Sequence, residues 1–325
     1  MKNDPILTIV VPSYNTSKYV DECLPTFCDE RLINKIKVVL IDDGATDDTA
    51  EKIKRYTSKY PEIFSFFHKE NGGHGSVINF AVFNLVSTKY FKVIDGDDWT
   101  DPSILLDFTT FLYGSDYDLV VNDYVNVYQD KQVYQNAFCP GTKDKYLDYH
   151  ISIHSVTFRT NIFIKHNIRV REHVFYEDNE FVLFPLEYVK SIGYFNKPVY
   201  YYRLGNSNQS VSFSSMMKRI GDYLLVKDDV VEKYKIWING SNNELKAYTE
   251  YSLCCFYSWI IECFLLLKKS RNEFIEIKKE IQTMHIVKQK LEKIRIYHFV
   301  SSFDFRFLRL KRHLINRYLK RQQGE

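Results

Sequence analysis

Short apolar runs alternate with amphipathic segments along the first hundred residues of this sequence. Four mostly apolar runs end in polar or turn residues, which is typical of buried strands, and they lie at 6–12, 36–42, 63–68 and 90–95. Apolar residues between them recur at helical spacing, which predicts helices at 18–28, 47–60 and 76–86. Nearly continuous apolar strands separated by helices indicate an α/β fold, with a parallel sheet covered by helices on both faces.

The pattern changes in the second hundred residues. A longer strand of mixed polarity is expected at 117–128, a helix at 176–189 and a further strand at 196–203. Beyond that strand, strand signals disappear and apolar residues recur at helical spacing. The sequence therefore predicts an α/β domain at 1–214 and a helical region at 215–325.

The composition is that of a globular protein, since 45% of the 325 residues are hydrophobic and 26% are charged. The six cysteines show no CxxC spacing, so we interpret them as buried thiols of a reducing compartment and expect a cytoplasmic protein. The most apolar segment, 253–267, contains Glu262. It is shorter than the ~20 residues that a membrane span needs, so we expect a buried helix there.

Polar residues directly follow three of the predicted strands. The first strand leads into Tyr14 and Asn15, the second into Asp42 and Asp43, and the fourth into an acidic turn at 95–98. In parallel sheets, ligands bind beyond the carboxyl ends of the strands. The three strand ends are therefore expected to converge on one ligand site.

The acidic turn lies in FKVIDGDDWTD and contains Asp95, Asp97 and Asp98. Like charges this close raise one another's pKa and weaken the fold unless a positive group lies among them. Two carboxylates on a tight turn can bind a divalent cation, and Mg²⁺ or Mn²⁺ commonly shares such a site with phosphates. An ordinary solvated turn explains the same residues, because Asp and Gly are common in turns. Both interpretations stay open at this point.

Two further segments carry candidate binding groups. Asp42 and Asp43 precede the residues that cap the next helix, so a carboxylate there could accept a hydrogen bond from a uracil imide or a ribose hydroxyl. A Gly-rich segment, KENGGHGSVIN at 69–79, enters a helix, and its backbone N–H groups could face an anion. It fits neither the P-loop nor the GxGxxG pattern. His74 within it is interpreted as a turn residue in preference to a ligand.

Four motifs, VPSYN, IDDGATDDT, NGGHGSVIN and VIDGDDW, occur in this order, and together they resemble the family-two inverting glycosyltransferases of GT-A fold. The resemblance covers about residues 6–212, and four motifs in order are specific where any one alone is weak. It implies a Rossmann-like, mostly parallel sheet and a nucleotide diphosphate sugar as donor, with a UDP-sugar expected. It also implies Mn²⁺ or Mg²⁺ as cofactor, held by Asp95 together with Asp97 or Asp98.

The resemblance further implies a base for the acceptor hydroxyl, commonly the Asp of a Glu-Asp pair that leads a helix. The segment YEDNEF supplies this pair, which implies Asp178 as the base with Glu177 beside it. An ordinary acidic helix start is the alternative. His154 and His173 could complete a metal shell, although no spacing requires them. The residues implied for donor binding are Pro12, Tyr14, Asn15, Asp42, Asp43, Gly73, Asn79, Asp95, Gly96, Arg203 and Ser210.

Two other classes of protein are compatible with acidic residues at the carboxyl ends of the strands. A nucleotidyltransferase or phosphotransferase would use the same carboxylates on a different bond and would not need Asp178. A non-catalytic saccharide-binding protein is disfavoured, because every motif carries its expected acidic residue. The resemblance also suggests a saccharide or lipid-linked acceptor of the kind used to build bacterial surface polysaccharides.

The C-terminal segment is basic, since residues 285–325 contain 11 Lys and Arg against 3 Asp and Glu. Apolar residues recur at helical spacing from Phe303 to Tyr318, with most basic residues on the other side. Such a helix could bind an anionic membrane surface through 300–325, which would make the protein peripheral on the inner face of the membrane. It could instead pack on the catalytic domain or on a second subunit of a homo-oligomer. We slightly prefer packing, and we expect no nucleic-acid partner.

Overall fold

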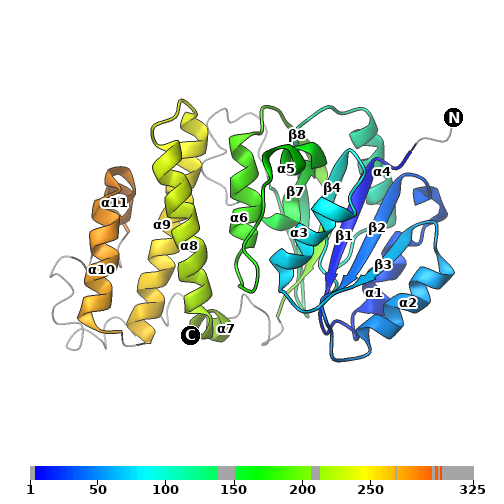
Figure 1. Ribbon diagram of the computed structural model, residues 1–325, viewed down its shortest axis with the longest axis horizontal. Coiled ribbons are helices and arrows are strands. Elements are labelled where there is room, and N and C mark those ends of the chain that lie inside the picture. Colours follow the sequence, from blue (N-terminus) through cyan, green and yellow to red (C-terminus); the bar gives the residue numbers. More distant parts are fainter. Residues whose placement is uncertain are drawn as a thin grey trace. The chain divides into compact units, whose positions relative to one another are not determined.

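The computed structural model describes residues 4–137, 151–205, 213–267, 269–294, 297–298 and 301 (Figure 1). The chain divides into two compact units, Met1–Gln209 and Ser210–Glu325. All the strands that the structure describes lie in the first unit, and the described elements of the second are helices.

The first unit is built on one sheet, which has eight strands in the described part of the chain. The order is β3-β2-β1-β4-β7-β5-β6, and β8 pairs with β5. The strands β3, β2, β1 and β4 run parallel, as do β5 and β8, whereas β7 and β6 are antiparallel to their neighbours. The predicted α/β fold with a mostly parallel sheet is therefore confirmed. The strands are Leu7–Ser13 (β1), Ile36–Asp42 (β2), Phe64–His68 (β3), Tyr90–Val93 (β4), Leu119–Val127 (β5), Gln132–Gln135 (β6), Val156–Arg159 (β7) and Ile192–Arg203 (β8).

Most predicted helices of the first unit are present, but the one expected at 18–28 is not continuous. It is replaced by a short α-helix and a 3₁₀ turn, because Pro25 has no N–H and its ring clashes with the carbonyl of the preceding α-helical turn. The helices are Val20–Cys23 (α1), Thr49–Lys59 (α2), His74–Asn84 (α3), Pro102–Tyr113 (α4), Thr160–His166 (α5) and Asp178–Leu183 (α6). The 3₁₀ turns are Leu24–Phe27 (η1), Glu30–Leu32 (η2), Ile153–Ser155 (η3) and Phe184–Glu187 (η4).

Helices cover both faces of this sheet. Successive strand residues point to opposite faces, so apolar residues on both faces need helices to bury them. On one face, Leu7, Ile9 and Val11 of β1 pack in a core with residues of α1, α2 and α4. On the other face, Phe91 of β4 and Phe181 of α6 lie with ring centres 6.0 Å apart. Phe158 and Phe163 complete this aromatic cluster. The cluster seats α6 on β4 and β7, and so it places the Glu-Asp pair at the start of α6.

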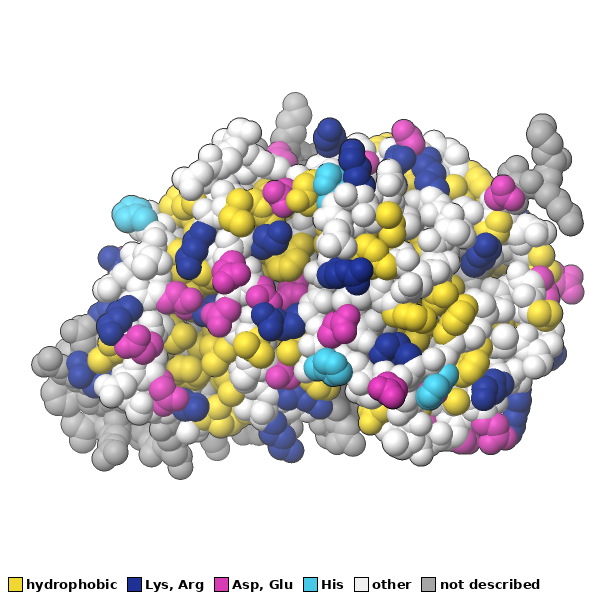
Figure 2. Space-filling model, in the orientation of Figure 1, with side chains coloured by type: hydrophobic (Ala, Val, Ile, Leu, Met, Phe, Trp, Pro, Cys, Tyr) yellow, Lys and Arg dark blue, Asp and Glu magenta, His cyan; other side chains and the backbone are white. Residues whose placement is uncertain are grey.

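The second unit is helical, as the sequence predicts. Its helices are Phe213–Lys218 (α7), Ile220–Trp237 (α8), Asn243–Leu266 (α9), Arg271–Gln282 (α10) and His285–Glu292 (α11). Among the described residues, ion pairs join these helices, including Lys227 with Glu280 at 2.7 Å and Lys290 with Glu250 at 3.0 Å. On the face drawn in Figure 2, Lys and Arg side chains are interspersed with Asp and Glu rather than gathered in one patch.

The most apolar segment of the sequence lies in α9 and is largely buried, as expected. Among the described residues, no helix combines the length and the apolar character needed to cross a bilayer. The predictions for residues 300–325 fall outside the described residues, apart from Ser301. Membrane binding and packing of that segment therefore stay predictions.

The described cysteines are unpaired, but they are not all buried. Cys23, Cys254 and Cys263 are buried, whereas Cys28 is half-buried and Cys255 is exposed. The expectation of uniformly buried thiols is therefore wrong for these two. In α9, Cys254 and Cys255 are adjacent, and adjacent residues of a helix point in directions about 100° apart. Cys139 lies outside the described residues.

Candidate active site

The acidic turn follows β4 and is pressed against the end of β1. The Gly96 N–H donates to the carbonyl of Pro12 at 3.0 Å. A Cβ atom at position 96 would lie 2.8 Å from Ser13 Oγ and 2.9 Å from the Pro12 oxygen. Only glycine fits this contact without a shift of the backbone, which explains the glycine between Asp95 and Asp97. Gly96 and Pro12 thus shape the turn in this structure.

A buried tyrosine and a backbone N–H hold the carboxylates of the turn. The Tyr200 hydroxyl, from β8, lies 3.0 Å from Asp95 Oδ2 and 2.6 Å from Asp98 Oδ2. The Arg203 N–H donates to Asp98 Oδ1 at 2.7 Å. Burial, followed by the charges of Asp97 and Asp95, raises the pKa of Asp98 well above its usual range. Burial and the Asp95 charge raise the pKa of Asp97 to about 6, so the turn carries unfavourable negative charge.

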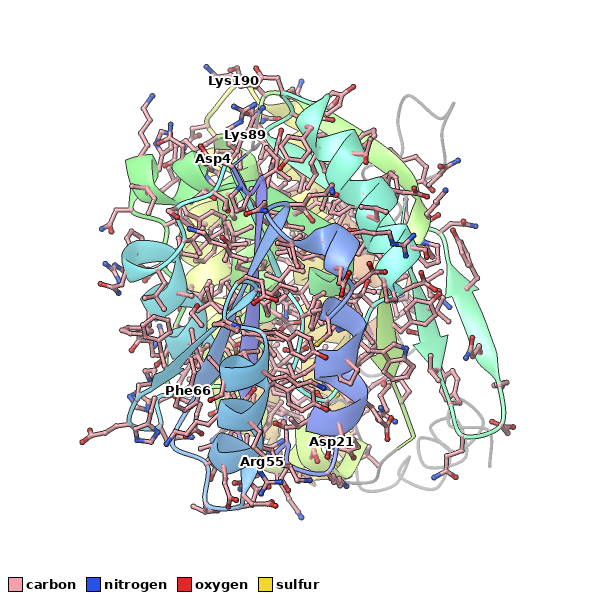
Figure 3. The ribbon with its side chains drawn as sticks, turned by 90° about the vertical axis from the view of Figure 1, so that its right-hand side faces the viewer. Asp4, Asp21, Arg55, Phe66, Lys89 and Lys190 are labelled. Atoms are coloured by element: carbon pink, nitrogen blue, oxygen red, sulfur yellow. The ribbon has the colours of Figure 1, made fainter. Side chains whose placement is uncertain are left out.

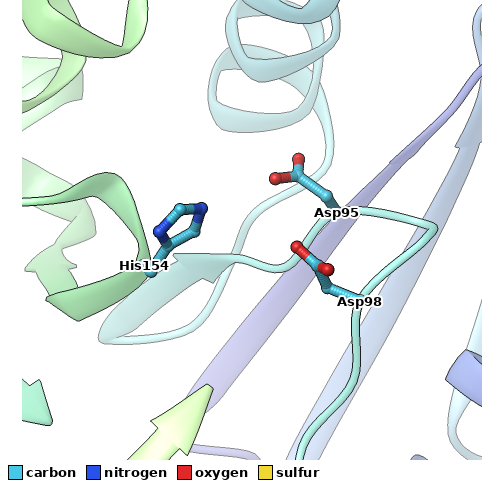
Figure 4. A group of neighbouring side chains, drawn as sticks. All are labelled: Asp95, Asp98 and His154. Carbon is cyan, nitrogen blue, oxygen red and sulfur yellow. The ribbon is translucent and has the colours of Figure 1, made fainter. Parts of the chain in front are cut away.

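A histidine from a distant part of the chain completes a possible cation site. The ligand atoms of Asp95, Asp98 and His154 all lie within 4.8 Å of one another (Figure 4). His154 belongs to η3, and its ring is 4.5 Å from the Tyr200 ring and 4.0 Å from the Tyr202 ring, centre to centre. Two carboxylates and an imidazole are donors that suit a divalent metal ion. We call Asp95, Asp98 and His154 the cation group.

Asp97 is not part of the cation group, although the sequence analysis offers it as a ligand. Its backbone carbonyl accepts a hydrogen bond from Arg203 Nε at 3.0 Å. The Arg203 guanidinium lies between the rings of Tyr19 and Trp99, 4.8 and 4.7 Å from their centres, and pairs with Glu22 at 2.5 Å. Arg203 therefore braces the acidic turn in this structure, and its predicted role in donor binding stays a prediction.

His74 connects the acidic turn to the Glu-Asp pair. Interpreted from the sequence as a turn residue, it is instead the first residue of α3. Its Nε2 lies 3.0 Å from Asp95 Oδ1 and its Nδ1 lies 2.6 Å from Glu177 Oε1. Burial lowers the pKa of His74, but hydrogen bonds to Asp95 and Glu177 outweigh burial and hold it well above 6.5. The imidazolium that results can donate to both carboxylates at once.

Asp178 is the first residue of α6 and is half-buried beside the buried Glu177. Burial and the charge of Glu177 raise the pKa of Asp178 to about 6. A carboxylate with this pKa is deprotonated in most molecules at neutral pH and is a stronger base than an ordinary Asp. Glu177 is engaged by His74, whereas Asp178 accepts a hydrogen bond from the neighbouring Asn179. The role of Asp178 as a base stays a prediction.

The carboxylates after β2 have protein partners. Asp42 accepts from the Ala45 N–H at 2.8 Å and lies 2.8 Å from His68 Nδ1. Asp43 accepts from the Gly72 and Gly73 N–H groups at 3.0 and 2.8 Å, and it pairs with Lys69 at 2.7 Å. In this structure Asp43 orders the Gly-rich segment, where Gly73 has a φ of 83° that suits glycine. Their predicted role in holding a nucleoside stays a prediction.

The remaining predicted donor-binding residues differ in exposure. Tyr14 is half exposed at the end of β1, and Asn15 Oδ1 accepts from the Thr46 N–H at 2.8 Å. Asn79 is buried and exchanges hydrogen bonds with the backbone N–H and carbonyl of Val170. It therefore ties α3 to the segment that precedes the Glu-Asp pair. Ser210 lies outside the described residues.

Comparison with known proteins identifies the family. Residues 8–177, just over half of the chain, match glycosyl transferase family 2. The chain belongs to this family. The resemblance seen in the motifs is thereby confirmed, and the protein is a glycosyltransferase rather than a nucleotidyltransferase, a phosphotransferase or a non-catalytic saccharide-binding protein.

Relatives of this glycosyltransferase cover most of its length. It is 23% identical to a glycosyltransferase of Mycoplasma pneumoniae, over 80% of this chain and 93% of that protein. It is 21% identical to a glycosyltransferase of Haemophilus influenzae, over 91% of this chain and 99% of that protein. A shorter alignment, 33% identical, covers 31% of this chain and 14% of the chondroitin synthase of Escherichia coli.

Solved structures share the fold. Staphylococcus aureus TarS 1–349 in complex with UDP-GlcNAc has a TM-score of 0.68 at 19% identity, and the match covers 95% of this chain and 92% of that one. The mannosyltransferase PcManGT of Pyrobaculum calidifontis, in complex with GDP-Man and Mn²⁺, has a TM-score of 0.55 at 12% identity, covering 95% and 87%. These matches confirm the predicted GT-A fold with C-terminal helices.

 No sequence spacing singles out three residues of the candidate site in this glycosyltransferase, although His154 is one of the two histidines expected to be able to complete a metal shell. His74 lies 21 positions before Asp95, whereas His154 and Tyr200 lie 56 and 102 positions after Asp98, so they keep no regular spacing with the acidic turn. Side chains that meet only through the folding of the sheet leave no periodic pattern in the sequence, so the motifs alone do not reveal them.

Proposed function

We propose that this glycosyltransferase moves a sugar from a nucleotide diphosphate sugar, a UDP-sugar in the first place, to an acceptor hydroxyl with inversion at the anomeric carbon. The observation that carries the proposal is the pair of hydrogen bonds made by His74. They bring the cation group and the Glu177–Asp178 pair to one rim of the sheet. The choice of UDP is supported by TarS, whose solved complexes contain UDP-GlcNAc and UDP.

The cation group is suited to a divalent ion, which would be held by Asp95, Asp98 and His154. Such an ion supplies positive charge to the leaving diphosphate when the donor is bound. The donor set fits Mn²⁺ better than Mg²⁺, because Mg²⁺ prefers oxygen ligands and one of these groups is an imidazole. The ion would also compensate the like charges of the acidic turn, which raise the pKa of Asp98 next after burial.

Asp178 is the proposed base. Its carboxylate removes the proton of the acceptor hydroxyl while the hydroxyl oxygen forms a bond to the anomeric carbon from the face opposite the diphosphate. The bond from that carbon to the diphosphate oxygen breaks, and the nucleoside diphosphate leaves with the electron pair. A base is needed because a sugar hydroxyl is a poor nucleophile at neutral pH. We propose a saccharide or lipid-linked acceptor, and the name of the chondroitin synthase relative supports the saccharide.

The proposed donor class is tested by thermal unfolding with UDP-, GDP- and dTDP-sugars, each in Mn²⁺ and in EDTA. We expect a UDP-sugar to raise the unfolding temperature in Mn²⁺ only, because ligands that bind the folded state stabilise it and the diphosphate needs the cation. Mg²⁺ in place of Mn²⁺ tests the preference for the cation. Equal stabilisation by UDP-sugar in EDTA would contradict the cation requirement, and stabilisation by GDP-sugar alone would contradict the choice of UDP.

The rate of transfer should fall as the pH decreases through about 6, because Asp178 acts in its deprotonated form and its pKa is raised to about 6. The measurement is the pH dependence of kcat with the donor and acceptor held at saturation. Donor binding is followed over the same pH range as a control, since other carboxyl groups of the rim also titrate. An acid limb centred near the ordinary carboxyl value of about 4 would argue against Asp178 as the base.

A further inference from the structure

Lys92 is an ionisable side chain inside the sheet that has no part in the proposed chemistry. It lies on β4, three positions before Asp95, and is fully buried. Burial lowers the pKa of Lys92 to about 7, so its surroundings resist a charge. Its neighbours on the strand, Phe91 and Val93, are buried apolar residues. An amino group at such a position requires an explanation in the contacts that it makes.

The amino group of Lys92 has three hydrogen-bond acceptors. They are Asn122 Oδ1 at 3.1 Å, the His154 carbonyl at 2.7 Å and the Val156 carbonyl at 3.2 Å. Three acceptors match the three donors of an ammonium group. Asn122 is also fully buried, and its Nδ2 lies 3.4 Å from the same His154 carbonyl. Lys92 and Asn122 together therefore hold the backbone of His154.

These contacts begin where the pairing of β4 with β7 ends. The last backbone pair between the two strands is Phe91 with Phe158. Beyond it, the Lys92 side chain bonds the carbonyls of Val156 and His154. The side chain thus ties β4, which leads into the acidic turn, to η3, which carries His154.

Lys92 also contacts the tyrosine that holds the acidic turn. Its Nζ lies 5.7 Å from the centre of the Tyr200 ring, within the range of a cation–π interaction. The Tyr200 hydroxyl is within hydrogen-bond distance of Asp95 and Asp98, and its ring packs on that of His154. A single buried amino group therefore touches both residues on which the geometry of the cation group depends.

We propose that Lys92 is a positioning residue that fixes His154 and Tyr200, and through them the geometry of the divalent-cation site. The inference rests on the proposed cation-dependent function. A side chain without the amino group would leave the His154 carbonyl and the Asn122 amide short of a donor, and η3 could then shift away from the acidic turn. Loss of a residue that orients a metal ligand typically weakens metal affinity about 10–100-fold.

The test compares Lys92→Met with Lys89→Met in the full-length protein, by titration with Mn²⁺ and detection of free Mn²⁺ by electron paramagnetic resonance. Methionine approximates the length of lysine and removes the amino group. Lys89 is a matched control, because its Nζ also donates to a carbonyl, that of Ser115 at 2.6 Å, and also lies over a ring, that of Tyr90 at 5.3 Å. In Figure 3 it lies near Asp4, at the end of the sheet where β1 and β4 begin.

We expect the Kd for Mn²⁺ to rise about 10-fold or more in Lys92→Met and to stay unchanged in Lys89→Met. The unfolding temperature in EDTA separates this role from a purely structural one. A Lys92→Met protein that is less stable in EDTA but binds Mn²⁺ as the wild type does would overturn the proposal. If Lys92→Met does not fold, Asn122→Ala weakens the same anchor and is expected to raise the Kd as well; an unchanged Kd in that variant would also overturn the proposal.

The same experiment separates this inference from the proposed function. Wild-type protein that binds no Mn²⁺ would contradict the cation-dependent function and the role of Lys92 together. Wild-type binding that Lys92→Met retains would contradict the role of Lys92 alone and leave the function intact.

Discussion

Asp178→Asn should lower the rate of sugar transfer by about 10²–10⁴-fold, the range expected when a general base is removed. Asparagine has nearly the same shape as aspartate but cannot accept the proton of the acceptor hydroxyl. The affinity for the nucleotide should change little, because the base acts on the acceptor rather than on the donor. The measurements are kcat for transfer and the Kd for UDP in Mn²⁺.

A matched control for this variant is Asp107→Asn. Asp107 lies on α4, is exposed and pairs with Lys197 at 2.8 Å, so its neutralisation should leave both kcat and the Kd unchanged. Folding of Asp178→Asn should be intact, because the change removes a charge that lies beside Glu177. Near-wild-type turnover in Asp178→Asn would refute its role as the base. An equal loss of UDP affinity would instead place Asp178 among the groups that hold the donor.

Neutralising the acidic turn should abolish cation-dependent nucleotide binding. In the double variant Asp97→Asn/Asp98→Asn we expect the affinity for UDP in Mn²⁺ to fall by about 100-fold or more, because metal ligands and their neighbours act together. Stability in EDTA should not decrease, since the change relieves repulsion among buried like charges. Calorimetry with UDP in Mn²⁺ and in EDTA measures the first effect, and thermal unfolding in EDTA measures the second.

The single variants Asp97→Asn and Asp98→Asn separate the contributions of the two carboxylates to the affinity for UDP. Since Asp98 belongs to the cation group and Asp97 does not, Asp98→Asn alone should reproduce most of the loss and Asp97→Asn should retain most of the affinity. The opposite result would assign the cation to Asp97 and leave Asp98 as a support for the turn. Undiminished UDP binding in the double variant, or in EDTA with the wild type, would refute a cation site at this turn.

Much of the first unit could be predicted from periodicity and motifs. The expected strand at 36–42 has the same bounds in the structure, and α2 and α3 lie where amphipathic spacing predicts helices. The start of α6 at Asp178 also follows from local chemistry, because acidic residues favour a helix N-terminus. These features are set by residues near one another along the chain, so the sequence alone determines them. The exceptions are the helices expected at 18–28 and 176–189, which are each divided into a short α-helix and a 3₁₀ turn because Pro25 and Pro185 limit otherwise helical segments.

Only the tertiary structure decides which side chains contact the acidic residues of the candidate site. The sequence offers Asp95 with Asp97 or Asp98 as cation ligands, and the fold adds His154 from η3 to Asp95 and Asp98. It also gives His74 a bridging position between Asp95 and Glu177. These contacts join segments that are remote in sequence, and no local pattern records them.

Lys92 shows most clearly which features local sequence determines and which the tertiary structure decides. Its place on a buried strand follows from the apolar run around it, but its three acceptors come from β5, η3 and β7. A buried amino group is tolerated only where its hydrogen bonds are satisfied. Local sequence determines that a strand forms at this position. The sheet order β4-β7-β5 supplies the acceptors, because only the assembled sheet brings those carbonyl and amide groups within hydrogen-bond distance of one side chain.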